Sequence, residues 1–493
     1  MKKRILPIIL TLGLLLTAFA GCGGEPETGT GKTTAQTGIP TSSASNGTPG
    51  GPTGDASGSP SGGDSDSAGT VEEEIVLDYS DFIMPEETGS LTVYTTGMLG
   101  LVMNPAVERF RELYPNVTVN VQSLGDDEFD ARIETEIPAG KGPDVLFDYM
   151  LPDMYKTIES GIFEDLNPYM QNDPDFHEED YYDVLGVGLL NGVRGILPVE
   201  IELPILQTTE EALADAGISR EELRTWDGFM AAARRYKEQY PDNTVFSYGR
   251  DDGYLTDMVR NSGMAFVDYR NRVPAVDREQ MKQLCDFCAL DFLEGAQTEL
   301  GNDGWYQKGG AVVLRKVLFT NFTGETLSLT MARYHHEAQS GENLIFEAVP
   351  DVNDGVTAKL VSFAGIPNSS PNKLNAWRLI KILLSDEIQG GSNPPGYYYL
   401  RIGFPVRRES MEKRIADNVR SFYADGGPEY EDRIERDIAD ISEVYGRMSG
   451  CSSVQSIVMK YIYNSMTPYL KGNAPFDKCF EDLYNTLELY ASE

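Results

Sequence analysis

The chain has 493 residues, and its 77 acidic side chains outnumber its 41 basic ones, which gives a formal net charge of -36 at pH 7. Nucleic-acid phosphates require a basic surface, so this charge argues against a nucleic-acid partner and indicates a solvated acidic surface. The sequence contains three histidines and neither a G-x-S-x-G nor an H-E-x-x-H motif, so it offers little for catalysis.

The N-terminus has the pattern of a signal peptide. Basic residues precede an apolar stretch at 5–19, which does not fit a spanning helix. The following Ala-Gly-Cys, with Cys22 last, resembles a bacterial lipobox, although Phe19 departs from the usual leucine. We therefore expect residues 1–21 to be removed and Cys22 to be acylated, which would anchor the chain to the extracytoplasmic face of the cell membrane. Simple secretion with a free Cys22 is the alternative.

Residues 22–85 are predicted to form a disordered tether. Gly, Ser, Thr, Pro and Asp dominate as far as about position 70, and no aromatic residue occurs there, so no core can form. As a flexible coil, about 60 residues span roughly 40 Å root-mean-square, which is enough to hold a folded head away from the membrane.

The remaining residues, 86–493, are long enough for two packed lobes. They begin with a short β-rich segment at 90–95. Asn104 then has the features of a helix cap, with Pro105 at the first helical position. Apolar residues at helical spacing predict one buried stripe on this helix: Met103, Val107, Phe110 and Tyr114.

Further strands and a helix follow in alternation. Val117, Val119 and Val121 alternate as in a half-buried strand, and a helix is expected around Phe129. Residues 143–147 (PDVLF) have the continuous apolar character of a strand buried on both faces. This order predicts an α/β fold with a mostly parallel sheet, helices on both faces and ligands at the carboxyl ends of the strands.

Cysteines and histidines give no sign of a metal site. Four cysteines besides Cys22 could form two disulfides in an exported chain: Cys285, Cys288, Cys451 and Cys479. The spacing of Cys285 and Cys288 on an apolar helical pattern favours two buried free thiols over a disulfide or a zinc site. His335 and His336 point apart on a helix, which favours a solvated polar face over a metal site.

Segments spread over nearly all of residues 86–493 carry a family resemblance through their shared order. They are AGKGPDVLF, ESGIFEDLNPYM, GILPVEIE, TWDGFMAAARRY, WYQKGGAVVL, SSPNKLNAWRLIKILLSDEIQ, GFPVRRE and MTPYLKGNAPFDKCFEDLYNTLELY. In this order they resemble family 1 of the bacterial extracellular solute-binding proteins, the sugar-type receptors of ABC importers. Many relatives carry a Tyr-Asn-Lys run where this chain has Gln207, Thr208 and Thr209, so the local ligand contacts do not carry over there.

The resemblance implies a two-lobed periplasmic-binding-protein-like (type II) α/β fold with a hinge of several crossing strands. Mapped by segments, lobe 1 takes residues 86–199 plus 344–364, and lobe 2 takes 200–343 plus 365–493. A sugar or short oligosaccharide would lie in the cleft between the lobes, and the closed head would dock on ABC permease subunits. Proteins of this kind are usually monomers and use no cofactor.

The resemblance also implies ligand contacts in the first lobe and in the hinge. Five lie in loops after two strands: Thr96, Gly97, Met98, Asp148 and Tyr149. Three lie in crossing segments: Glu202, Phe363 and Gly365. Glu202 matches a carboxylate that holds a sugar hydroxyl in some relatives, and a hinge salt bridge is an equal alternative. At Gly365 the absence of a side chain would permit close approach to a ligand.

In the second lobe, aromatic residues and one arginine are the candidates: Trp305, Arg315, Phe319, Tyr397 and Tyr398. Arg315 would suit a polyol or an anionic sugar. Trp305 is equally compatible with packing, and so are the tyrosines, which belong to a run that continues to Tyr399. The other two tryptophans, Trp226 and Trp377, match packing positions of the family and are expected in the core.

These features predict a lipid-anchored protein that captures a carbohydrate and delivers it to an ABC permease without catalysis. A non-sugar solute, such as a peptide or an anionic uronate, is the first alternative. An anchored enzyme acting on polysaccharide is the second, and would need two carboxylates about 5 to 10 Å apart in the cleft. A sensor that kept the fold but serves a signalling partner is the third.

Overall fold

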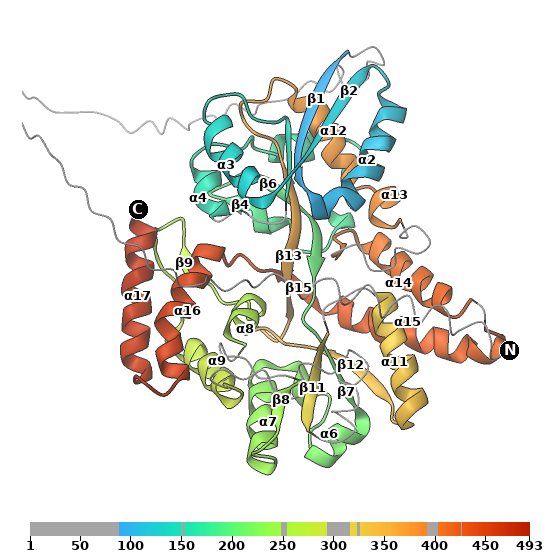
Figure 1. Cartoon of the computed structure of the whole chain (residues 1–493), viewed down its shortest axis with the longest axis vertical. Helices are drawn as coiled ribbons and strands as arrows, with labels where there is room; N and C mark the ends of the chain where they lie inside the picture. The colour runs from blue at the N-terminus through green and yellow to red at the C-terminus, as the bar shows by residue number, and fades with distance from the viewer. Residues whose placement is uncertain are drawn as a thin grey trace, which may run out of the picture. The chain divides into compact units, whose positions relative to one another are not determined.

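The computed structural model describes residues 88–148, 151, 153–247, 254–292, 316–322, 326–391, 403–424 and 426–493 (Figure 1). Its strands are β1 (Gly89–Thr96), β2 (Val117–Leu124), β3 (Val145–Asp148), β4 (Leu189–Leu190), β5 (Val193–Arg194), β6 (Ile196–Glu202), β7 (Ile205–Thr209), β8 (Thr244–Phe246), β9 (Val267–Asp268), β10 (Val273–Pro274), β11 (Val317–Phe322), β12 (Leu344–Ala348), β13 (Val356–Gly365), β14 (Phe404–Pro405) and β15 (Met448–Cys451). Its α-helices are α2 (Gly100–Leu113), α3 (Asp126–Glu136), α4 (Met154–Glu159), α5 (Asn167–Asn172), α6 (Glu210–Ala216), α7 (Trp226–Gln239), α8 (Leu255–Asn261), α9 (Arg278–Leu290), α11 (Thr326–Ser340), α12 (Lys373–Leu383), α13 (Asp386–Gln389), α14 (Arg408–Phe422), α15 (Glu431–Gly446), α16 (Ser456–Leu470) and α17 (Phe476–Ser492).

The first sheet has the strand order β14-β6-β13-β3-β1-β2, with β15 paired to β13. β1 runs parallel to both β2 and β3, as the strand and helix alternation predicts. β13 runs antiparallel to β3 and to β6. The α/β class is therefore confirmed, but the sheet is mixed, because β13 runs antiparallel to both of these neighbours.

Side-chain alternation along the strands decides which helices cover each face of this sheet. Val93 and Phe147 point to one face and join a core with α2 and α12. Tyr94 and Leu146, their chain neighbours, point to the other face and pack with α3 and α4. Successive residues of a strand face opposite sides, so the sheet is covered by helices on both faces, as expected.

The first helix begins earlier than the sequence indicates. A 3-10 turn at Gly97–Leu99 leads directly into α2, which starts at Gly100. Asn104 is therefore not a cap, and Pro105 lies within the helix. Met103, Val107 and Phe110 form a buried stripe as predicted, whereas Tyr114 is half-buried and lies just after the helix.

The second sheet has the order β12-β7-β11-β8. Its core includes residues of α6, α7, α8 and α9 together with the C-terminal helices α16 and α17. Trp226, at the start of α7, is 4% exposed and donates its ring N–H to Gln283 Oε1 at 2.9 Å. Trp377 on α12 has no exposed surface and donates to Asp173 Oδ2 at 2.8 Å. Both tryptophans are core residues, as predicted.

The chain crosses between the two sheets at places that differ from the expected lobe boundaries. β12, expected with the first lobe as part of 344–364, pairs with β7 in the second sheet, whereas β13 belongs to the first sheet. α12 and β14, expected in the second lobe, lie with the first sheet: α12 packs on α2 (Figure 1) and β14 pairs with β6. These partners are distant in sequence, so local pattern could not assign them.

The four cysteines of the described chain are free thiols. Cys285 and Cys288 are fully buried on α9, as the apolar helical pattern predicts. Burial raises the pKa of the Cys451 thiol to about 12. In the described part of the chain, no helix combines the length and apolar character needed to cross a membrane.

Candidate functional site

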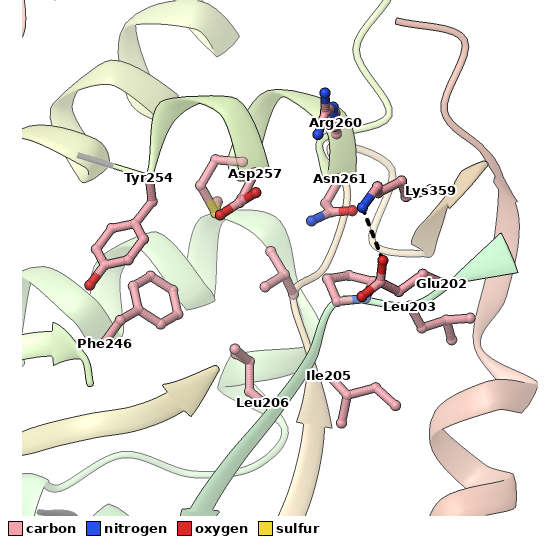
Figure 2. A pocket seen from close by; sticks show the side chains of 13 residues that line it. Glu202, Leu203, Ile205, Leu206, Phe246, Tyr254, Asp257, Arg260, Asn261 and Lys359 are labelled. Carbon is pink, nitrogen blue, oxygen red and sulfur yellow. Dashed lines mark hydrogen bonds and ion pairs between the residues drawn. The ribbon is translucent and has the colours of Figure 1, made fainter. Parts of the chain in front are cut away.

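A cavity of about 290 Å³ lies where the chain passes from the first sheet to the second (Figure 2). Residues 202–206 form one wall, where β6 ends and β7 begins. β8 contributes Phe246, and β13 contributes Lys359. The helix α8 and the residue before it supply the remaining polar side chains: Tyr254, Asp257, Arg260 and Asn261.

An ion pair between two strands borders this cavity. Glu202 and Lys359 are register partners on β6 and β13, and Lys359 Nζ lies 3.0 Å from Glu202 Oε2. The Glu202 side chain is 15% exposed and that of Lys359 is 43% exposed. Glu202 thus lines a cavity and also forms an ion pair at the crossing, so both roles considered from the sequence are present in its geometry.

The aromatic wall of the cavity is formed by Phe246 and Tyr254, whose ring centroids are 4.6 Å apart. Tyr254 has a left-handed backbone (φ 62°) immediately before the first residue of α8. Phe246 is 2% exposed and Tyr254 is 1% exposed, so the second core holds both rings and only a small part of their surface borders the cavity.

A buried carboxylate supports this wall from behind. Asp291 Oδ2 accepts the backbone N–H groups of Val245 at 2.8 Å and Phe246 at 3.1 Å. Asp291 is 2% exposed, and Lys237 Nζ lies 3.7 Å from its other oxygen. Burial raises the pKa of Asp291 to about 6, against the lowering effect of the backbone hydrogen bonds and of Lys237.

The first-sheet candidates gather at a different place. Thr96 and Asp148 end the neighbouring parallel strands β1 and β3, and Phe363 is the register partner of Asp148 on β13. All three are at most 2% exposed. Gly97, which begins the 3-10 turn after β1, is exposed.

Phe363 lies four positions after Lys359 on β13, which is about 13 Å along an extended strand. The structure therefore brings Thr96, Asp148 and Phe363 together, while Glu202 lies at the other end of the same strand pair.

Three candidates have structural surroundings that sequence reasoning did not anticipate. Phe319 has no exposed surface, stacks on Phe229 at 5.7 Å between ring centroids and does not line the cavity, so it offers no platform to a ligand there. Phe363 packs in the core on the α3 face. At Gly365 a side chain would meet the ring of Phe163 and the carbonyl of Gly195 at 2.9 to 3.0 Å, so the close approach there is made by the protein itself.

Several expected site residues lie outside the described residues: Cys22, Tyr149, Trp305, Arg315, Tyr397 and Tyr398. Met98 lies in the 3-10 turn after β1, but the description does not extend to its side chain. The ligand contacts expected at these positions stay predictions.

The run that departs from the family pattern lies in β7. Gln207, Thr208 and Thr209 are buried in this inner strand between β11 and β12. Thr209 caps α6, because its hydroxyl accepts the backbone N–H of Ala212 at 3.0 Å. These polar residues thus have structural positions in the sheet, and Gln207 pairs in register with Thr320.

Sequence reasoning missed most of the polar cavity wall. Lys359 could have been found, because it interrupts the apolar strand VTAKLVSFAG and a lysine there needs an acidic partner. Arg260 and Asn261 are the last two residues of α8 and belong to no recognised sequence motif, so only the position of α8 reveals them.

The adjacent histidines lie on α11, and His336 is 8% exposed, so the expected solvated face does not hold for it. Burial lowers the pKa of His336. Across the described ranges, no group of three or more His, Cys, Asp or Glu residues has the arrangement of a metal site.

Comparison with solved structures identifies the fold. The sugar-binding protein MalE from Xanthomonas citri matches with a TM-score of 0.60 at 14% identity, covering 82% of this chain and 97% of that one. A family 1 extracellular solute-binding protein from Alicyclobacillus acidocaldarius matches with a TM-score of 0.54 at 13% identity, covering 83% and 100%. The substrate-binding protein Lmo0181 from Listeria monocytogenes, solved with cycloalternan, matches with a TM-score of 0.50 at 13% identity, covering 82% and 100%.

These neighbours are type II periplasmic binding proteins, so the predicted fold is confirmed. Comparison with curated protein sequences gave no significant match. The family model described as bacterial extracellular solute-binding protein matches residues 97–390, which is more than half of the chain. The chain belongs to the bacterial extracellular solute-binding protein family.

Proposed function

We propose that this protein binds a carbohydrate at the crossing between its two sheets and delivers it to the permease of an ABC importer. The family is one of substrate-binding proteins, and the similar structures include one named a sugar-binding protein and one solved with cycloalternan. In this proposal the chain acts without catalysis and without a cofactor, and its partner is a membrane permease.

The cavity at the crossing is the observation that carries the proposal. Sugars present apolar C–H faces and rings of hydroxyl groups, so their sites combine aromatic surfaces with fixed polar groups. Phe246 and Tyr254 supply the first, and Glu202, Lys359 and Asn261 supply the second. The Glu202–Lys359 pair offers acceptors and donors held in place by two strands, which suits vicinal hydroxyl groups.

We further propose that the ligand site extends along β13 toward the ends of β1 and β3. Thr96 Oγ1 is buried there and makes no hydrogen bond within the described residues. This hydroxyl could form a hydrogen bond with a longer saccharide that extends beyond the cavity. Gly97, next in the chain, is exposed, and a methyl group there would meet only Ser123 Oγ at 3.7 Å.

Anchoring through Cys22 and the tether of residues 22–85 completes the proposal. Two or more acyl chains give stable membrane attachment, and the tether would leave the head free to reach the permease. Fractionation of cells that express the chain tests this step. Cys22→Ser should move the protein from the membrane to the soluble fraction, and an unchanged distribution would contradict lipid anchoring.

Ligand binding is tested on the full chain purified in detergent. Thermal unfolding is measured with a panel of mono- and oligosaccharides, and with amino acids and peptides as a second panel. A ligand at about one hundred times its Kd should stabilise the folded form by about 2.7 kcal/mol, which is an easily measured rise in Tm.

Matched substitutions connect a binding result to the cavity. Glu202→Gln should lower the affinity for the saccharide. Glu210→Gln, at an exposed position on α6, should leave the Kd of the saccharide unchanged. Stabilisation by peptides alone would overturn the carbohydrate proposal. Equal Kd values for the wild type and Glu202→Gln would place the saccharide elsewhere.

A further inference from the structure

Two donor side chains occupy the last two positions of α8 and border the cavity: Arg260 and Asn261. Within the described residues, neither side chain forms a hydrogen bond or an ion pair. Arg260 is half-buried. A chain with 77 acidic and 41 basic side chains has acidic partners in excess, so an arginine beside a cavity without one is unusual here.

The charges around the cavity are divided between two sides. Figure 2 shows the carboxylate of Asp257 on the side of Tyr254, whereas Arg260 and Asn261 lie toward Lys359. Lys359 already neutralises Glu202 at 3.0 Å. The Lys359 side of the cavity therefore offers a guanidinium and a side-chain amide whose N–H groups have no acceptor in the described chain.

This arrangement matches the chemistry of an acidic group. A guanidinium presents parallel N–H donors that pair with a carboxylate or a sulfate through two hydrogen bonds. The neighbouring amide of Asn261 can add a third donor. The aromatic wall of Phe246 and Tyr254 is on the other side, where the uncharged part of a ligand would lie.

Resting on the proposed carbohydrate function, we propose that the ligand is an acidic saccharide, whose carboxylate or sulfate binds Arg260 and Asn261. The rest of the saccharide occupies the cavity beside Phe246 and Tyr254, and its hydroxyl groups meet the Glu202–Lys359 pair. The acidic group of the ligand is the ion-pair partner of Arg260, which has none within the described chain.

The test compares saccharides that differ in charge. The full chain in detergent is titrated calorimetrically with α-1,4-trigalacturonate, with its fully methyl-esterified form and with maltotriose. A sulfated chondroitin disaccharide distinguishes a sulfate from a carboxylate, and triglutamate tests an acidic peptide. We expect trigalacturonate or the sulfated disaccharide to bind, with affinity that falls as salt is raised, and both neutral trisaccharides to bind at least about tenfold more weakly.

Three variants assign the acidic group to its site. Arg260→Met should lower the affinity for the acidic saccharide at least about tenfold. Arg260→Lys should restore part of this affinity, because lysine returns the positive charge but not the two parallel N–H donors of the guanidinium. Arg234→Met changes an exposed arginine on α7 that does not border the cavity, and should leave the Kd unchanged. Circular dichroism of each variant confirms that it is folded.

The outcomes separate this inference from the proposed function. If maltotriose or the methyl ester binds as tightly as trigalacturonate, the ligand is a neutral saccharide, and only the inference is overturned. If an acidic saccharide binds with the same Kd to folded Arg260→Met, the assignment to α8 is wrong. If triglutamate alone binds, both the inference and the carbohydrate function fail.

Discussion

Asp291 supports the aromatic wall of the cavity, and its ionisation should make the stability of the second sheet depend on pH. Its pKa is about 6 in the folded protein, against an ordinary value of 3.8, because burial disfavours the charge. As pH rises, the unfolded chain therefore loses this proton before the folded protein does. The free energy of unfolding is highest below about pH 4, falls between pH 4 and 6, and is constant above that window with respect to this group.

The size of the effect follows from the two pKa values. One pKa unit corresponds to 1.36 kcal/mol, so a difference of about two units corresponds to about 3 kcal/mol lost between pH 4 and pH 7.5. Asp291→Asn removes the charge, and its side-chain oxygen can still accept the N–H groups of Val245 and Phe246. The variant should therefore gain stability over the wild type as pH rises, by up to about 3 kcal/mol.

Urea denaturation at pH 4.0, 5.0, 6.0 and 7.5 measures this difference. Comparing variant with wild type at each pH cancels the titration of the other carboxylates, which is the same in both. Asp242→Asn, at an exposed position in the turn before β8, serves as the control and should show no such trend. A constant difference between Asp291→Asn and the wild type from pH 4.0 to 7.5 would refute the argument.

Three further predictions concern packing. Asp437 is fully buried and pairs at 2.8 Å with the fully buried Arg333 on α11, which also pairs with Asp440 at 2.7 Å, so Asp437→Asn should cost about 1.5 to 3 kcal/mol in urea denaturation. Glu112→Gln, in an exposed pair, should cost less than about 0.5 kcal/mol, and equal losses would contradict the role of burial. Gly188→Ala should lower Tm, because a methyl group there would lie 2.2 Å from a backbone carbonyl of β6; an unchanged Tm would show that the chain adjusts easily. Cys285 and Cys288 should react with a thiol reagent only after unfolding, because both are fully buried and burial raises the pKa of Cys285; fast reaction in the native protein would contradict this.

Local pattern was sufficient for the parallel part of the first sheet. Val117, Val119 and the PDVLF segment have the alternation or continuous apolar character of strands, and the structure has β2 and β3 there, both parallel to β1. The start of α2 was not predictable in the same way. Pro105 fits the first position of a helix, but the preceding 3-10 turn already brings the chain into helical conformation, and the proline is accommodated within α2.

Contacts between residues far apart in the sequence determine the strand pairing and the site geometry that local pattern could not predict. The sequence of β12 indicates a strand but not that it would pair with β7 across a separation of more than a hundred residues. For the site, the family resemblance placed Glu202 correctly at the crossing and did not reveal its partner Lys359. Phe319 was a candidate platform because it follows a matched segment, yet an apolar strand residue is also a core residue, and the structure buries it completely.

The crossing at Leu203 and Pro204 also limits how the chain can change in length during evolution. Only these two residues separate β6 from β7, and the Pro204 carbonyl accepts the backbone N–H of Val349 at 3.0 Å. An inserted residue would shift β6 against β13 or β7 against β12, and a one-residue shift turns every side chain of a strand to the opposite face. Homologues should therefore differ in length at surface turns, such as that between β4 and β5, and keep this connection at two residues.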